Sequence, residues 1–172
     1  MRHAIAAGLA GLAIFALAAP AAAQQKSEDA AFKFMKSETL GEMKLDMTEA
    51  EIAKLLPAKP ARAREQLWGA DGQYHQKWAY RARGLTLGMV SEKKGAAKAL
   101  ESITCAARCT LKTSRGIGLG STLADAQKAY AAEFNKEESK PDVFVAGSIY
   151  GGLILNFKAG KVSAMFLGAA AE

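Results

Sequence analysis

The sequence is poor in the residues and motifs that most enzyme sites and metal sites require. It has two histidines and two cysteines in 172 residues, and His75 is the only histidine after residue 23. A structural zinc site usually needs four ligands, so metal binding is not expected. The sequence also lacks the Gly-x-Ser-x-Gly nucleophile elbow and the paired histidines of metallohydrolases. We therefore expect no catalytic residues, no cofactor and no metal ion.

His75 leaves two interpretations open. A solvated histidine beside the turn expected at Asp71-Gly72 is the favoured one. A general base would need a nucleophile nearby, and the sequence indicates none. A hydrolase that uses His75 is therefore the least favoured function.

The glycine-rich stretch Gly116–Ser121 does not have the pattern of a nucleotide site. It lacks the Gly-Lys-Ser/Thr ending of a P-loop, and its spacing differs from the dinucleotide-binding fingerprint. The start of the helix that follows could hold an anion weakly. We favour the simpler interpretation, a tight turn that leads into a capped helix.

The chain begins with a segment that is typical of export. A basic start at Arg2 precedes the apolar run Ile5–Ala19, and small residues that suit a signal peptidase continue to Ala23. The run is short for a bilayer span, so a membrane anchor is the weaker alternative. We expect a signal peptide over residues 1–23, a cut after Ala23, and a periplasmic or secreted product.

The charge of the mature chain is mildly basic. Without Arg2, the 23 Lys and Arg fall to 22 against 17 acids, which gives a net charge of +5. These basic residues are scattered, which favours a solvated surface over nucleic-acid binding. Weak contact with an anionic membrane surface or with an acidic partner stays open.

The two cysteines, Cys105 and Cys109, enclose only three residues. An even number of cysteines in an exported chain favours a disulfide. So short a loop limits its stabilisation to ~2–3 kcal/mol. Free thiols and a metal or redox pair are weaker alternatives, because redox pairs usually have Cys-x-x-Cys spacing.

Two stretches of the chain share one layout, 74 residues apart. In each, a threonine (Thr48 or Thr122) precedes a carboxylate by three residues, which is the spacing of a capping box. We expect helices from about Glu49 to Leu56 and from Leu123 to Phe134.

Strand-like runs follow each expected helix. Asp71-Gly72 lies between the runs 65–70 and 73–82 and predicts a hairpin with a type I′ turn. Further strands are expected at 85–89, 98–104, 143–146, 148–150, 153–157 and 161–167.

The aromatic residues Tyr74, Trp78 and Tyr80 lie on one face of the second run. Flat aromatic side chains on a sheet bury a large area at little entropic cost, which suits a protein-binding surface. The same residues could instead pack beneath the helices. Both interpretations stay open, and these three residues are the candidate binding site.

The later strands of the two halves also correspond. Residues 84–89 align with 152–157, and residues 100–103 align with 162–165. We therefore expect an α+β fold of two tandem repeats, each a helix followed by an antiparallel meander, with the helices on one face of a shared antiparallel sheet. The expected parts are a signal peptide (1–23), an N-terminal tail (24–39), repeat 1 (40–104), a connector (105–115) and repeat 2 (116–172).

The segment Leu45–Ile52, followed by Trp78-Ala79-Tyr80, resembles the signature of small bacterial-envelope domains of the SmpA/OmlA type. Those domains have a Gly-Met-Thr-x-x-Glu-Val start and a Trp-x-Tyr strand. Two tandem copies in one exported chain resemble the β-lactamase-inhibitory protein family. The resemblance covers roughly residues 40 to 168.

The sequence departs from that pattern in several places. Asp46 stands where the first copy usually has glycine, and Gly120-Ser121-Thr122 stands for Gly-Met-Thr in the second. The second copy has no Trp-x-Tyr. The lipoprotein cysteine is also missing, so the resemblance does not imply outer-membrane anchoring.

The resemblance implies a binding or assembly module rather than an enzyme, with the open sheet face as the contact surface. Our first hypothesis is an exported, non-enzymatic protein-binding module, such as an inhibitor of a secreted or periplasmic enzyme. The alternative is a structural or assembly factor of the bacterial cell envelope. In both cases the expected partner is another protein.

Overall fold

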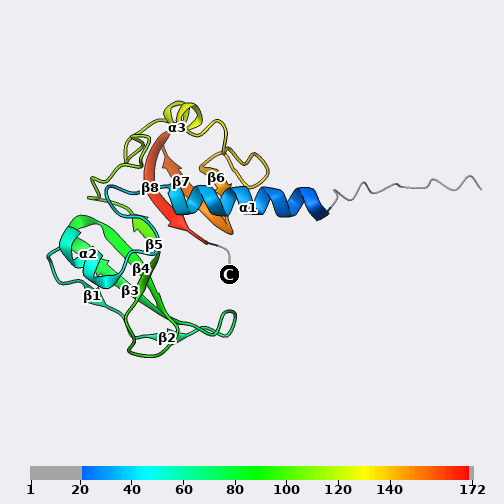
Figure 1. Cartoon of the computed structure of the whole chain (residues 1–172). Helices are drawn as coiled ribbons and strands as arrows, with labels where there is room; N and C mark the ends of the chain where they lie inside the picture. Colours follow the sequence, from blue (N-terminus) through cyan, green and yellow to red (C-terminus); the bar gives the residue numbers. More distant parts are fainter. Residues whose placement is uncertain (1–20, 171–172) are drawn as a thin grey trace, which may run out of the picture.

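The chain folds around one antiparallel β-sheet (Figure 1). The computed structural model describes residues 21–170, with side chains from residue 28 onward. This described part contains three α-helices and an eight-stranded sheet in the order β1-β3-β4-β5-β8-β7-β6, with β2 also paired to β3. The expected α+β class with an antiparallel sheet is therefore confirmed.

The elements have the following bounds. The helices are α1 (Ala21–Ser37), α2 (Glu49–Leu55), the 3-10 helix η1 (Arg81–Arg83) and α3 (Leu123–Ala129). The strands are β1 (Ala61–Arg62), β2 (Gln66–Leu67), β3 (Tyr74–Tyr80), β4 (Leu85–Ser91), β5 (Ala99–Cys105), β6 (Val143–Ser148), β7 (Gly151–Lys158) and β8 (Lys161–Gly168).

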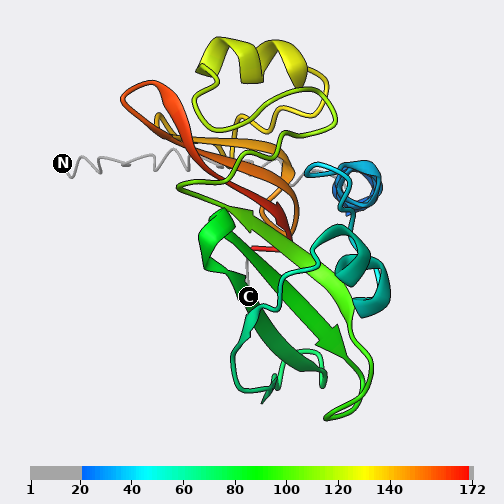
Figure 2. The ribbon, with the colours of Figure 1, turned by 90° about the vertical axis from the view of Figure 1, so that its left-hand side faces the viewer.

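One face of the sheet carries the core. On β4, Leu85, Leu87 and Met89 are buried, and the residues between them are less buried, as strand alternation requires. Phe34 of α1 and Ile52 of α2 belong to the same buried cluster. Figure 2 shows α1 and α2 together on one side of the sheet. The opposite face carries small or polar residues such as Thr86 and Thr104 over β4 and β5, and apolar residues such as Ile154 over β7.

Both expected capping boxes are present. The Thr48 hydroxyl accepts from the Glu51 N–H, and the Glu51 carboxylate accepts from the Thr48 N–H. Thr122 and Asp125 make the same pair of bonds at the start of α3. These bonds satisfy backbone donors that a helix start leaves unpaired.

The end of α3 differs from the prediction. The helix ends at Ala129 rather than continuing to Phe134. Phe134 instead forms a β-bridge with Ala146 and stacks on Phe144, with 4.9 Å between the ring centroids. Tertiary packing against β6 therefore stops a segment that has good helix propensity.

The hairpin at Asp71-Gly72 is present, but its turn is longer than expected. The Trp68 N–H donates to the Gln73 carbonyl (2.9 Å), which leaves residues 69–72 as the loop. A type I′ turn needs positive φ at both central residues, and only Gly72 of this pair has it, at +70°. The type I′ prediction is therefore wrong, and β2 is shorter than the expected run.

The expected strand at 148–150 is also wrong. Ser148 ends β6 and pairs with Gly151 at the start of β7. Ile149 and Tyr150 are needed as the turn between these two antiparallel strands.

Helix α1 occupies most of the region expected to be a tail. Of the expected tail, residues 24–37 belong to α1, and this helix contacts β6 and β7 (Figure 1). Phe34 and Met35 are 9% and 4% exposed, so hydrophobic burial holds this helix on the sheet. Among the described residues, no helix is long and apolar enough to cross a membrane.

The expected signal peptide lies, apart from its last three residues, outside the described residues. Residues 1–20 carry no structural description, and residues 21–23 lie at the start of α1. The cut after Ala23 therefore stays a prediction.

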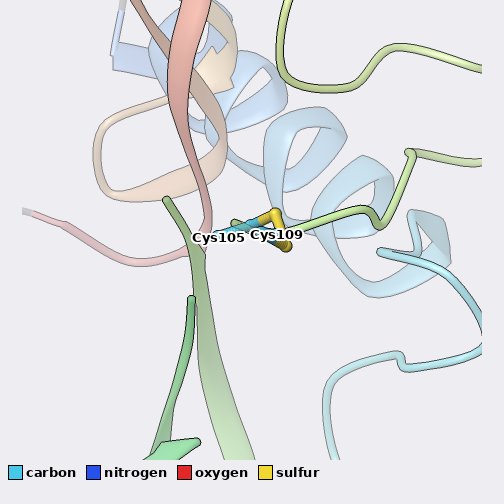
Figure 3. Close-up of a disulfide and its surroundings, with 2 residues drawn as sticks. All are labelled: Cys105 and Cys109. Carbon is cyan, nitrogen blue, oxygen red and sulfur yellow. A yellow bond between two sulfur atoms is a disulfide. The ribbon is translucent and has the colours of Figure 1, made fainter. Parts of the chain in front are cut away.

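Cys105 and Cys109 form the expected disulfide (Figure 3). Their Cα atoms lie 5.5 Å apart, and Cys105 is fully buried at the end of β5. The bond pins the start of the connector to the sheet. Arg108, inside the loop, takes a positive φ of 77° to close it.

Equivalent backbone hydrogen bonds hold the region before each capped helix to the sheet. The Asp46 N–H donates to the Leu100 carbonyl (2.8 Å), and the Gly120 N–H donates to the Val162 carbonyl (2.9 Å). In both places the N–H of the same sheet residue donates a second hydrogen bond, to the carbonyl of the residue that follows Asp46 or Gly120. Asp46 and Gly120 also share positive φ values, 68° and 89°.

We predict that Thr48→Ala and Thr122→Ala each lower the free energy of unfolding by about 1 kcal/mol, because each removes a helix cap. Urea unfolding followed by circular dichroism measures the change. Thr48→Ser and Thr122→Ser keep the hydroxyl and serve as controls. Serine variants as unstable as the alanine variants would contradict the capping role.

Candidate functional site

The sheet face opposite the core holds an open groove of about 990 Å³. One wall is the segment 63–71, which contains β2 and which we call the arm. The residues of the groove floor are Lys77, Thr86, Gly88, Ser102, Thr104 and Phe166. Their strand positions alternate with those of the core residues, which places these side chains, the large Phe166 included, on the opposite face.

A β-bulge in β5 shapes the groove floor. Gly88 pairs with Ser102, whereas the next residue, Met89, pairs with Leu100. Glu101 is therefore an extra residue in β5. As a result, Glu101 and Ser102 both line the groove, although strict alternation would place neighbours on opposite faces.

Gly88 makes room for the bulge. A Cβ atom at this position would lie 3.1 Å from Glu101 Oε1 and still closer to Ser102 Oγ. Such a close approach explains why this strand position holds glycine.

His75 lies beside the groove between two carboxylates. Its Nδ1 is 2.9 Å from Glu101 Oε1, and its Nε2 is 2.9 Å from Asp71 Oδ2. The Trp68 ring stacks on the imidazole with 3.6 Å between centroids and 12° between planes. His75 is only 6% exposed. The expectation of a solvated histidine is therefore wrong, because the long turn brings Trp68 and Asp71 back over it.

Both ring nitrogens of His75 are engaged. Each nitrogen already lies within hydrogen-bond distance of a carboxylate oxygen, so neither is directed at a nucleophile. The described residues also include no group of three or more His, Cys, Asp or Glu side chains that could hold a metal ion. This cluster therefore has the geometry of a clamp that holds the arm to β5.

Asp71 is the outer carboxylate of the clamp. A hydrogen bond from the Gln73 N–H (2.9 Å), together with the bond from His75, lowers the pKa of Asp71 below its ordinary value of 3.8. Asp71 is therefore ionised at neutral pH, and it links the hairpin turn to the imidazole.

A second ion pair anchors the arm. Glu65 pairs with Lys98, whose side chain is 3% exposed, and accepts a bond from the Gly95 N–H (3.0 Å). The Lys98 contact, followed by the Gly95 contact, lowers the pKa of Glu65. The arm is thus tied to the β4–β5 hairpin as well as to His75.

The predicted aromatic residues lie mainly in the core instead of the groove. Trp78 and Tyr80 are 2% and 6% exposed, and Tyr74 is half-buried. They share the sheet face on which the helices pack, so the core interpretation fits Trp78 and Tyr80. The intervening residues of β3, His75 and Lys77, line the groove instead.

The sequence pattern does not indicate that Trp68, Glu101 and Gly88 belong to one site. The alternation of β3 could have placed His75 and Lys77 together once the aromatic face was assigned to the core. The local sequence does not indicate that Glu101 contacts His75, because the two residues lie 26 positions apart and meet only through the bulge.

Comparisons with protein-family models, with curated proteins and with solved structures found no match to this chain. The resemblance of Leu45–Ile52 and Trp78-Ala79-Tyr80 to envelope domains therefore stays a proposal. The function has to be inferred from the geometry of the groove and its arm.

We predict that Gly88→Ala lowers the free energy of unfolding by about 1–2 kcal/mol, because the added methyl group overpacks the bulge. Ser102→Ala removes the nearest clashing atom. The double variant Gly88→Ala/Ser102→Ala should therefore recover most of the loss in a urea-unfolding double-mutant cycle. Strictly additive effects of the two substitutions would contradict the clash.

We predict a pH-dependent contribution from Asp71. A carboxylate with a lowered pKa in the folded chain stabilises the fold above its ordinary pKa of 3.8, and this contribution is lost as pH falls through the folded-state pKa. The wild type should therefore lose more stability than Asp71→Asn between about pH 5 and pH 2. Urea unfolding of both proteins across this range measures the difference. A difference that does not change with pH would contradict the lowered pKa.

Proposed function

We propose that the protein is an exported, non-enzymatic protein-binding module that uses the groove as its contact surface. The open groove on the sheet face opposite helices α1 and α2 is the observation that carries this proposal. Inhibition of a secreted or periplasmic enzyme is one activity that such binding would provide. Export rests on the signal-peptide pattern of the first 23 residues.

The sheet edges support binding through the face rather than by strand addition. The outer edge of β3 is covered by β1 and β2. The outer edge of β6 is covered by the segment 133–140. Within this segment, the Asn135 N–H donates to the Val145 carbonyl, and Lys140 forms a β-bridge with Val143. Long unpaired strand edges are the usual template for adding a partner strand, and β1 and β2 are only two residues each, so the sheet edges favour the groove as the contact surface.

The anchored arm supports a groove that is formed before binding. The Asp71–His75–Glu101 clamp and the Glu65–Lys98 pair hold the arm from two directions. A surface that is already ordered loses little conformational entropy when a partner binds. This rigidity suits an inhibitor, which must present one shape to an enzyme.

We also propose that the chain consists of two copies of one unit. The capped helices and their bonds to the sheet recur in both halves. A bulge also recurs, at Glu101 in β5 and at Ser163 in β8, opposite Gly88 and Asn156. Since Ser163 and Asn156 replace Glu101 and Gly88, the second copy cannot form the same clamp. The copies would therefore share a framework, with the clamp specific to the first.

The alternative is a structural or assembly factor of the cell envelope. Both functions use a protein partner, but they differ in where the protein resides. Fractionation of the producing cells separates them. Stable association with the outer membrane would favour the assembly factor, and free periplasmic or extracellular protein would favour the inhibitor.

We predict that Thr104→Trp abolishes partner binding, because an indole on the groove floor fills the space that a partner would enter. Affinity capture from envelope and culture-supernatant extracts, with quantitative mass spectrometry, measures the loss. Ala124→Trp on the exposed surface of α3 is the matched control and should keep the partner. Thermal unfolding confirms that both variants fold. A partner retained by Thr104→Trp would contradict the groove as contact surface.

A further inference from the structure

Two cations that line the groove have no counter-charge. Arg64 on the arm and Lys77 on β3 both line the groove and are exposed. Neither makes an ion pair within the described part of the chain. Nearby cations are used differently: Arg62 covers the Trp78 ring at 3.9 Å, and Lys98 pairs with Glu65.

Arg64 and Lys77 lie close along the backbone. The Ala63 N–H donates to the Lys77 carbonyl at 2.9 Å, so Arg64 directly follows the residue bonded to Lys77. The arm therefore holds Arg64 next in sequence to the residue that is hydrogen-bonded to Lys77, which brings the two cationic residues close together in the backbone. An anion placed there would gain attraction from both charges.

The acidic residues that line the groove are already engaged. Asp71 and Glu101 each contact a nitrogen of His75 at 2.9 Å. These two carboxylates therefore face His75 and not Arg64 or Lys77. The charged groove residues that make no ion pair within the described part of the chain are the cationic Arg64 and Lys77.

We propose that the groove recognises an acidic polypeptide segment of the partner protein. Aspartate or glutamate side chains of that segment pair with Arg64 and Lys77. Apolar side chains beside them pack on Trp68 and Phe166, which line the same groove. This inference rests on the proposed protein-binding function and adds the chemistry of the partner.

Charge and size both favour this partner over a nucleic acid. Nucleic-acid binding depends on many phosphate contacts, each of which needs a cation. The groove offers two unpaired cations within about 990 Å³, bordered by apolar residues of the arm. A short acidic segment with apolar neighbours matches this composition.

Selection from a random dodecapeptide library displayed on phage tests the proposal directly. The purified wild-type protein is the target, and binders that also bind Thr104→Trp are discarded as independent of the groove. We expect the remaining peptides to be enriched in Asp and Glu relative to the unselected library. An excess of Lys and Arg, or no charge preference, would overturn the acidic assignment.

Charge reversal provides the second part of the test. Lys77→Glu and Arg64→Glu should each weaken the selected acidic peptides by at least about fivefold, measured by fluorescence anisotropy, because attraction is replaced by repulsion. Raising the salt concentration should reduce wild-type binding in the same direction. Lys128→Glu on α3 is the matched control and should change affinity less than about twofold. Equal losses in all three variants would overturn the assignment to Arg64 and Lys77.

Failure of this inference and failure of the proposed function give different results. A library that yields no peptide sensitive to Thr104→Trp contradicts the groove as a binding surface, and the charge assignment falls with it. Groove-dependent peptides without an acidic excess leave the binding function intact and overturn only the chemistry of the partner. Thermal unfolding of each variant ensures that lost binding is not lost folding.

Discussion

The backbone pairing between β5 and β8 holds the sheet together. Its register covers three residue pairs, from Ile103 with Leu167 to Cys105 with Met165. The side chains of these two outer pairs, Ile103 with Leu167 and Cys105 with Met165, are fully buried. Because strand side chains alternate between faces, the register here decides which residues of both halves reach the core. The groove depends on the same register, since it brings Phe166 to the groove floor.

The groove exists because one extra residue interrupts this alternation. The bulge at Glu101 turns that carboxylate toward His75, and Gly88 leaves space for it. His75 then connects Glu101 to Asp71 and lies under Trp68, so a local irregularity in β5 fixes the position of the arm. Electrostatic pairing and stacking thereby convert a flat sheet face into a walled surface.

The helix caps and the disulfide were predicted correctly, whereas the ends of several elements and the surroundings of His75 were not. The capped helix starts and the disulfide depend on residues three or four positions apart, and both are confirmed. The length of α3 was overestimated because Phe134 packs on β6. The aromatic face of β3 could be defined from alternation, but its direction could not. His75 was misjudged because its partners come from the returning turn and from β5.

The sequence by itself determined where the two capped helices, α2 and α3, start, which residues share a strand face, and that the chain forms an α+β fold with a disulfide-closed connector. These features follow from hydrogen bonds and side-chain periodicity over a few residues. Only the tertiary structure decided that Trp78 faces the core and that Lys77, Arg64 and the His75 clamp border an open groove. Which face of a sheet is covered depends on helices distant in the chain, and burial of apolar area, rather than local pattern, makes that choice.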